Sequence, residues 1–428
     1  MLKKRGRFNE AFQVLDRCGM YGCALERMFT LGRHNADGRM KLDYWVFLSG
    51  GDLSYMEAIV DEYNSNQDEV YIDMILQDWD DYYTKIVTSV AAERGPDIGI
   101  SHAASLPQLM NQGLLQPVEE MMTGAGLDFN NFPENIRDAV EVDDELYAVP
   151  IDTHPFILYI NTDLAEEAGL LDEQGLPEIE ATPTGLLDYF TEAKEALPDK
   201  TPLAISTGGV DTYRWWWTVY FQMGGTPIFS DDLREPEITL DRDIAIAAAE
   251  YIHNFFGDVI PMHIGDFYET FQAGNAVGMM TGVWATGIWE AADLNFTAMP
   301  IPQSFDVEAA QGDSHTLIVP IKEEQSSERK EAIAEFIAFV SDEGAEWAKA
   351  GHIPARTDVV ESPEFQDQPF RADYAEVASK VVFTNKTIYQ NPAETDMIRA
   401  LDEIMSNRLT PEAGIDQMLK ALAVTTRQ

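Results

Sequence analysis

The sequence predicts an α/β protein whose strands form mostly parallel sheets flanked by helices. Apolar runs typical of strands alternate with segments of helical periodicity, and turn signals separate the two kinds of segment. The first such succession lies between residues 42 and 100 and follows the order strand, helix, strand, helix, strand. Parallel strands joined by crossover helices produce this order.

Length and charge limit the class of protein. The chain has 428 residues, enough for two or three domains with substantial cores. It carries 74 acidic and 29 basic side chains, a formal net charge of -45. This excess argues against binding to nucleic acid or to anionic lipid, and it predicts an acidic, well-solvated surface. No run of 18 or more apolar residues occurs, so the sequence predicts no transmembrane helix.

Residues 1–40 show weak periodicity, and we expect a leader or a poorly ordered segment there. They contain the two cysteines, Cys18 and Cys23, whose spacing fits neither a zinc site nor a C-x-x-C motif. Cys23 follows a glycine, as in a lipid-attachment site, but Asp16 and Arg17 interrupt the region that should be apolar in a signal peptide. Export and lipid anchoring at Cys23 stay open on these grounds.

Three strands are predicted in the first part of the body, at Leu42–Leu48, Val70–Leu76 and Ile98–Ile100. Ligands of parallel sheets collect at the carboxyl ends of the strands. The candidate binding residues that follow these ends are Asp52, Asp78, Trp79, Ser101 and His102. Asp52 and Asp78 could instead be helix N-caps, and His102 could be a solvated loop residue.

A change of element is predicted at Pro150 and Pro155, because proline fits poorly in a central strand. We interpret this point as the crossing into a second lobe, with Asp152 and Thr153 between the prolines as candidate binding residues. Strands and helices continue to alternate beyond it, which predicts a second α/β unit.

Aromatic residues concentrate in two later segments. The first contains Tyr213, Trp215 and Trp216, of which only some can face a cleft, since adjacent helical residues point in different directions. In the second, Gly282 precedes Trp284 and frees the backbone before a large ring, which would place that ring at the mouth of a cleft. Taken alone, Trp284 fits a core aromatic on a helix better than a ligand contact.

The order of short motifs resembles one family. The motifs are Gly50-Gly51-Asp52, Gly95-Pro96-Asp97, Tyr147–Pro150, Leu158–Asn161, Phe271–Trp284 and Ile353–Arg356. Together they resemble the extracellular solute-binding proteins of ABC importers, the carbohydrate-binding family that includes maltose-binding protein. The resemblance implies a periplasmic-binding-protein fold, in which two α/β lobes, joined by several hinge crossings, close around a ligand. It also implies that the Gly-x-Trp element, here Gly282 to Trp284, supplies a stacking ring.

The resemblance places the crossings at Pro150–Pro155, Met279–Thr281 and His315–Pro320. Lobe one would then hold residues 41–151 and 282–316, and lobe two residues 152–281 and 317–428. The implied function is reversible binding of a sugar or oligosaccharide outside the cytoplasm, by a monomer that delivers its ligand to ABC permease subunits. No catalytic residue, cofactor or metal is expected, since the seven histidines are scattered along the sequence.

A sugar requires flat aromatic rings for its C–H faces and planar polar groups for its hydroxyls. The predicted ligand-binding set is Asp52, Asp78, Trp79, Ser101, His102, Asp152, Thr153, Tyr213, Trp215, Trp216, Gly282, Trp284, Arg356 and Tyr389. Arg356 could instead form a salt bridge. The alternative functions are a carbohydrate-active enzyme using cleft carboxylates, a binder of another solute such as a glycerophosphodiester, and an acidic cytosolic scaffold. No G-x-S-x-G or H-E-x-x-H motif supports the enzyme.

Overall fold

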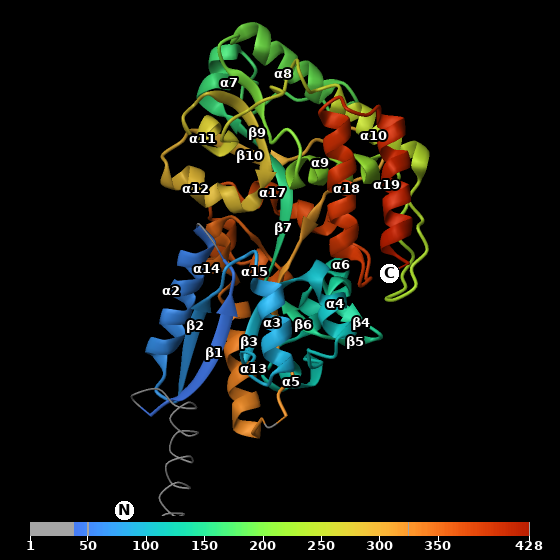
Figure 1. Ribbon diagram of the computed structural model, residues 1–428. Helices are drawn as coiled ribbons and strands as arrows, with labels where there is room; N and C mark the ends of the chain where they lie inside the picture. The colour runs from blue at the N-terminus through green and yellow to red at the C-terminus, as the bar shows by residue number, and fades with distance from the viewer. Residues whose placement is uncertain (1–37, 49–50, 324, 428) are drawn as a thin grey trace, which may run out of the picture.

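The computed structural model describes residues 38–48, 51–323 and 325–427. Nearly all of the expected leader, including Cys18 and Cys23, lies outside the described residues. Two lobes lie one above the other in Figure 1, and strands near the middle of the molecule join them. This confirms the predicted two-lobe α/β fold. Within the described ranges, no helix has the length and apolar character needed to cross a membrane.

Lobe one is built around a five-stranded sheet with the order β2-β1-β3-β12-β6. Its strands are β1 (Met40–Val46), β2 (Val70–Leu76), β3 (Ile98–His102), β6 (Ala148–Pro150) and β12 (His315–Ile318). β1 pairs in parallel with β2 and β3, as the sequence predicts. β12 runs antiparallel to β3 and β6 because it enters the sheet from the other lobe, at the end where the parallel strands finish.

Helices pack against this sheet through their apolar faces. The helices of lobe one are α2 (Gly51–Asn66), α3 (Tyr82–Ala91), α4 (Leu106–Asn111), α5 (Glu119–Gly124), α6 (Glu134–Ala139), α13 (Ser327–Asp342) and α14 (Gly344–Trp347), with the short 3-10 turns η1 (Ala103–Ser105), η2 (Phe129–Asn131) and η4 (Ala348–Ala350) and the hairpin β4 (Glu141–Val142)–β5 (Glu145–Leu146). α2 buries Met56, Ile59, Val60 and Tyr63, a spacing of one helical face.

Lobe two is built around a sheet with the order β10-β7-β9-β8. Its strands are β7 (Asp152–Asn161), β8 (Thr201–Ala204), β9 (Ala276–Gly282) and β10 (Phe296–Pro300). β7 is buried along its whole length, since it pairs on both sides and is covered on both faces. It runs antiparallel to β9 and β10, whereas β8 and β9 are parallel. This sheet is therefore mixed, because β7 leaves the hinge while β9 returns toward it.

The remaining elements surround this second sheet or follow the last crossing. They are α7 (Thr162–Ala168), α8 (Gly185–Ala196), α9 (Val210–Gln222), α10 (Arg242–His253), α11 (Phe267–Gln272), η3 (Val283–Ala285), α12 (Thr286–Ala291), β11 (Gly312–Asp313), β13 (Ile353–Pro354), α15 (Thr357–Val360), α16 (Pro363–Gln366), α17 (Arg371–Tyr374), η5 (Ala375–Lys380), α18 (Gln390–Met405) and α19 (Pro411–Thr425). Residues of α9, α10, α18 and α19 share one apolar core with β7 and β9.

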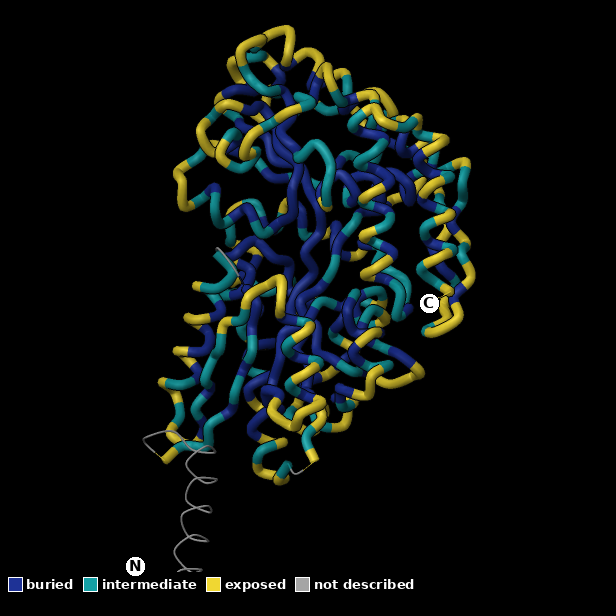
Figure 2. The backbone as a smooth tube through the Cα atoms, viewed as in Figure 1, coloured by how far each residue is buried: buried dark blue, intermediate teal, exposed yellow. Residues whose placement is uncertain are grey.

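Three crossings join the lobes, at the β6–β7, β11–β12 and η4–β13 connections. β11 and β13 both pair with the first residues of β7, so the three crossings lie together, and Figure 2 shows buried chain through this region. The structure differs here from the predicted boundaries. β10 lies in the second sheet, while β12 and α13 belong to lobe one. Met279–Thr281 is interior to β9 and does not cross, because β9 ends at the hinge and the chain continues into α12 of lobe two.

Candidate functional site

Aromatic rings form a continuous row from one lobe to the other. Trp79, after β2, contacts His102 at the end of β3, with ring centroids 5.3 Å apart. His102 contacts His154 of β7 at 5.7 Å, and His154 contacts Trp284 at 6.1 Å. We call these four residues the aromatic wall. Trp79 is 57% exposed and is the only aromatic side chain among the exposed large apolar residues of the described chain. The wall therefore offers ring surface from both lobes at their junction.

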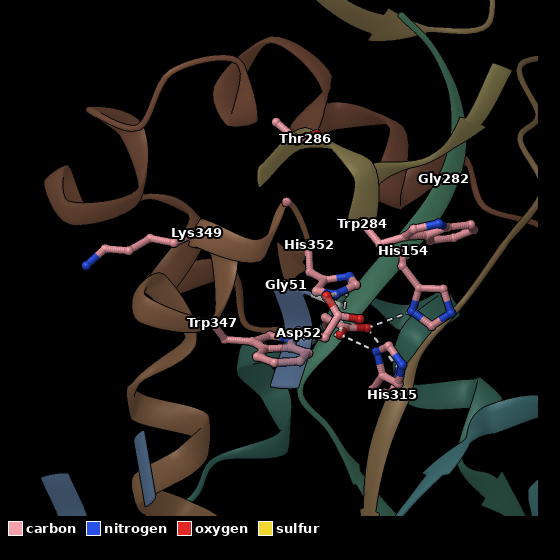
Figure 3. A network of polar contacts seen from close by, with 12 residues as sticks. Gly51, Asp52, His154, Gly282, Trp284, Thr286, His315, Trp347, Lys349 and His352 are labelled. Atoms are coloured by element: carbon pink, nitrogen blue, oxygen red, sulfur yellow. Dashed lines mark hydrogen bonds and ion pairs between the residues drawn. The ribbon is translucent and has the colours of Figure 1, made fainter. Parts of the chain in front are cut away.

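Trp284 lies against Gly282, as Figure 3 shows. A Cβ atom at Gly282 would stand 1.8 Å from the nearest atom of the Trp284 ring. The φ angle of Gly282 is -81°, which any residue adopts, so glycine is needed for space and not for backbone freedom. The sequence predicted that Gly282 frees the backbone before the ring, and this reason is wrong. The expected close association of Gly282 with Trp284 is present. The indole Nε1 donates to the hydroxyl of Tyr268 at 3.0 Å, which fixes the ring.

Charged groups gather beside Trp284. The Arg214 guanidinium lies 4.8 Å from the centroid of the indole and donates to Asp211 at 2.8 Å. Burial raises the pKa of Glu394 on α18, and Arg214 offsets this only in part. Burial also raises the pKa of Asp313 to about 7, although two backbone N–H groups favour its charged form. Carboxyl groups that are buried without full compensation gain from additional hydrogen-bond donors such as ligand hydroxyls.

The lobe-one side of the wall is held by Tyr83 of α3. The Tyr83 hydroxyl accepts from the backbone N–H of His102 at 3.0 Å and contacts His102 Nδ1 at 3.1 Å. Burial, followed by the neighbouring His315 and His154, holds the pKa of His102 well below its usual value, so the ring is neutral at pH 7. Ser101, immediately before it, is fully buried within β3 and orders the strand end.

Beneath the wall, Asp152 is surrounded by three histidines. Its carboxylate contacts His154 Nδ1 at 2.9 Å and His315 Nδ1 at 2.8 Å, and His352 Nδ1 lies 3.7 Å away. It also accepts from Trp347 Nε1 at 2.7 Å and from the backbone N–H of His315 at 2.9 Å. We call Asp152, His154, His315 and His352 the hinge cluster. Figure 3 labels its three histidines. The histidines are scattered along the sequence, from which we expected no metal-ligating group, and the fold brings three of them together around Asp152.

The electrostatics of the hinge cluster follow from its burial. Burial by itself would raise the pKa of Asp152, but the three histidines hold it well below its usual value. Burial, and then His315, lowers the pKa of His154 to about 4. Burial also acts to lower the pKa of His352, yet the carboxylates of Asp52 and Asp152 outweigh it and the net pKa is raised. The buried carboxylates thus favour positive charge on His352, whereas the low pKa of His154 keeps that ring neutral at pH 7.

Comparison with known proteins identifies the family. Residues 58–373 match the profile of the bacterial extracellular solute-binding proteins. The chain belongs to this family. It is 22% identical over 401 residues to the maltotriose-binding protein of Pyrococcus abyssi, covering 90% of this chain and 81% of that protein. It is 21% identical over 355 residues to the arabinooligosaccharide-binding protein of Halalkalibacterium halodurans, covering 77% of this chain and 75% of that protein.

Solved structures of similar fold agree with the two-lobe architecture. The GacH receptor of Streptomyces glaucescens, solved free and with acarbose, superposes with a TM-score of 0.76 at 16% identity, covering 91% of this chain and 98% of that chain. UgpB of Mycobacterium tuberculosis, solved with glycerophosphocholine, also gives a TM-score of 0.76, at 17% identity, covering 91% of this chain and 99% of that chain. At these identities the likeness establishes the fold.

Three predicted residues of this solute-binding protein lie on α9, in the lobe-two core. Trp215 and Trp216 are fully buried; Trp215 packs on Phe255, and Trp216 donates to the carbonyl of Ala245. Both were predicted to contact the ligand, and the structure shows that both are core residues, because α9 is covered on nearly all faces. Tyr213 is also buried, but its hydroxyl finds no hydrogen-bond partner among the described residues. Glu394, Arg214 and Asp313 are near enough to affect its pKa, so this end of α9 reaches the charged region.

Other predicted residues have mainly structural contacts. Arg356 donates to Asp342 and Asp358, which is the salt-bridge role that the sequence left open. Asp78 is exposed and caps a turn by accepting from the backbone N–H of Asp80, so it is not the N-cap of α3. Asp52 lies in the first turn of α2 and contacts His352 Nε2 at 3.0 Å.

Two further predicted residues lie near the junction. Thr153 is fully buried in β7, and its hydroxyl finds no partner in the described part of the chain. Tyr389 is half-buried at the N-terminus of α18, where Asn391 Nδ2 reaches Ser105 Oγ of lobe one at 3.4 Å. Sequence reasoning did not select Asp211, His154, Arg214, Tyr268, Asp313 or Glu394 as site residues. His154 could have been found, since it stands two residues after Asp152 at the predicted crossing.

Proposed function

We propose that this solute-binding protein binds a neutral sugar or oligosaccharide outside the cytoplasm, closes around it, and delivers it to the permease of an ABC importer. The observation that carries the proposal is the aromatic wall, which places Trp79 and Trp284 on opposite lobes and joins them through His102 and His154. A ligand lying along this wall contacts both lobes, so its binding energy favours the closed arrangement.

The polar groups beside the wall suit sugar hydroxyls. Arg214 and Asp211 form a planar donor–acceptor pair against the indole of Trp284, and Glu394 and Asp313 supply further carboxyl groups. Planar charged groups form the short, directional hydrogen bonds by which hydroxyl patterns are distinguished. Stacking against the Trp284 face requires the Arg214 side chain to move aside or to become one of the hydrogen-bonding groups. The sugar ligands named for the two relatives above support this class of ligand.

Arg214 also gives a specific reason to test a second ligand class. It is a cation at the wall, and the structural neighbour from Mycobacterium tuberculosis was solved with glycerophosphocholine. Asp211 already pairs with the Arg214 guanidinium at 2.8 Å, so a phosphate would have to compete with this carboxylate for the cation. We therefore favour the neutral sugar.

A ligand panel tests the proposal. The purified protein is screened by thermal shift against neutral mono- and oligosaccharides and against glycerophosphocholine, and every positive is measured by calorimetry. We expect a rise in Tm with neutral sugars, since a ligand that binds only the folded state stabilises it. Each incubation is also analysed for products by chromatography. A shift only with the phosphodiester, or the appearance of hydrolysis products, would overturn the proposal.

A further inference from the structure

The hinge cluster draws its four side chains from all three crossings. Asp152 and His154 begin β7 in the first crossing, His315 begins β12 after the second, and His352 precedes β13 in the third. Pairing of β11 and β13 with the start of β7 brings these segments together. All four side chains are at least nine-tenths buried. Of these four residues, only His154 belongs to the aromatic wall. The wall therefore gives no role to Asp152, His315 or His352.

The spacing of the polar atoms resembles that of metal ligands. One ligand atom from each of the four residues lies within 4.8 Å of all the others. The contacts from the Asp152 carboxylate to the three Nδ1 atoms are 2.9, 2.8 and 3.7 Å. In a tetrahedral zinc site with bonds of about 2.0–2.1 Å, neighbouring ligand atoms stand roughly 3.3 Å apart. The three separations from Asp152 scatter around this value, and the widest separation in the group, at most 4.8 Å, would have to shorten by up to about 1.5 Å to complete the tetrahedron.

The orientation of His352 is the second observation. Its Nε2 lies 3.0 Å from Asp52 Oδ1, and an ionised carboxylate can only accept, so Nε2 carries the hydrogen. In the neutral ring the lone pair is then on Nδ1, which faces Asp152 at 3.7 Å. That nitrogen is buried and has no hydrogen-bond partner among the residues described. A lone pair aimed at a buried carboxylate is unfavourable, and a cation between the two groups, either a proton on Nδ1 or a metal ion, removes this contact.

We propose that the hinge cluster is a binding site for a divalent transition metal of the zinc class, with Asp152, His154, His315 and His352 as its four ligands. Imidazole nitrogen and carboxylate oxygen are the donors that Zn²⁺ prefers, and four protein ligands without an open position define a structural site rather than a catalytic one. In the neutral rings of His154 and His315, the hydrogen moves from Nδ1 to Nε2 when Nδ1 becomes the ligand.

Two neighbours orient the ligands. Asp52 holds the His352 ring through Nε2, an arrangement typical of metal-bound histidine. Trp347 Nε1 donates to Asp152 Oδ2 at 2.7 Å and fixes the carboxylate from the other side. Asp52 and Trp347 are therefore positioning residues. A metal held in this way would tie the three crossings together and restrain the strands about which the lobes move.

Metal binding by the full chain tests the site directly. The protein is stripped with a chelator and titrated with Zn²⁺ by calorimetry, and with Co²⁺ by visible absorption. Excess Mg²⁺ is present throughout to occupy the many surface carboxylates. We expect one tight site per chain, the intense Co²⁺ absorption of tetrahedral coordination, and slower amide hydrogen exchange in residues 151–155, 312–316 and 351–354 when Zn²⁺ is bound. A weak octahedral Co²⁺ spectrum, or exchange unaltered by Zn²⁺, would overturn the proposal even without any variant.

Variants locate the site. His352→Gln keeps a donor for Asp52 but removes the Nδ1 ligand, and we expect the tetrahedral Co²⁺ spectrum to be lost. Asp52→Asn should retain one site with about 10–100-fold weaker affinity, as loss of an orienting partner typically causes. His263→Gln, at an exposed loop position, is the matched control and should bind as the wild type does. Equal Zn²⁺ affinity in wild type and a folded His352→Gln would show that the metal binds elsewhere.

Discussion

Replacing Gly282 by alanine tests how the glycine positions the Trp284 ring. The new Cβ would stand 1.8, 2.1 and 2.2 Å from three ring atoms, whereas ordinary carbon contacts begin at 3.4 Å. The ring must therefore retreat by roughly 1.6 Å, the difference between 3.4 and 1.8 Å. Such a shift breaks the 3.0 Å hydrogen bond from Trp284 Nε1 to Tyr268 and separates the indole from Arg214.

The expected magnitudes follow from these contacts. Overpacking costs about 1–3 kcal/mol, and a lost neutral hydrogen bond about 0.5–1.5 kcal/mol. We expect stability to fall near the lower end, because Trp284 is only half-buried and can move toward the junction. Displacing a stacking ring should weaken sugar binding by about 1–3 kcal/mol, which is roughly 5- to 150-fold in Kd.

Calorimetric titration with a sugar identified by the panel measures the loss, and thermal unfolding measures stability. Gly265→Ala is the matched control, since a Cβ at Gly265 meets no atom within 4 Å and the position is exposed. We expect it to leave both quantities unchanged. If Gly282→Ala binds the sugar with wild-type affinity, the Trp284 ring position does not matter for binding and the reasoning is wrong.

Three other changes have defined outcomes. Trp79→Ala should weaken sugar binding by about 1–2 kcal/mol with unchanged Tm, because the ring is 57% exposed; an equal loss of Tm would instead make it a core residue. Asp97→Asn should cost about 3–5 kcal/mol of unfolding free energy at pH 7 by leaving Lys322 and Arg329 unpaired. Burial acts to raise the pKa of Asp97 but these cations lower it overall, so the wild-type advantage is present above pH 4 and shrinks as urea titrations move to lower pH. Raising NaCl toward 1 M should increase Tm, since salt screens repulsion within a chain of net charge -45; a decrease would contradict this.

Local features of the site were accessible from the sequence. Gly282 and Trp284 stand two residues apart, so the steric relation between them depends on neither the lobes nor the hinge. Val70–Leu76 is both the predicted and the observed strand, because alternation and turn signals are local. His102 and Trp79 lie next to the ends of predicted strands, and the rule that ligands collect there is enough to select them.

The sequence by itself therefore determined the α/β class, the strand ends with their candidate residues, and the Gly282–Trp284 pair, because each depends on neighbours along the chain. Only the tertiary structure decided which tryptophans of α9 are core, since helices from residues 242–253 and 390–425 cover its outer faces. It also decided that Asp152, His315 and His352 meet, although 163 and 37 residues separate them in turn. No local pattern records that meeting, which follows from the pairing of three crossings at the start of β7.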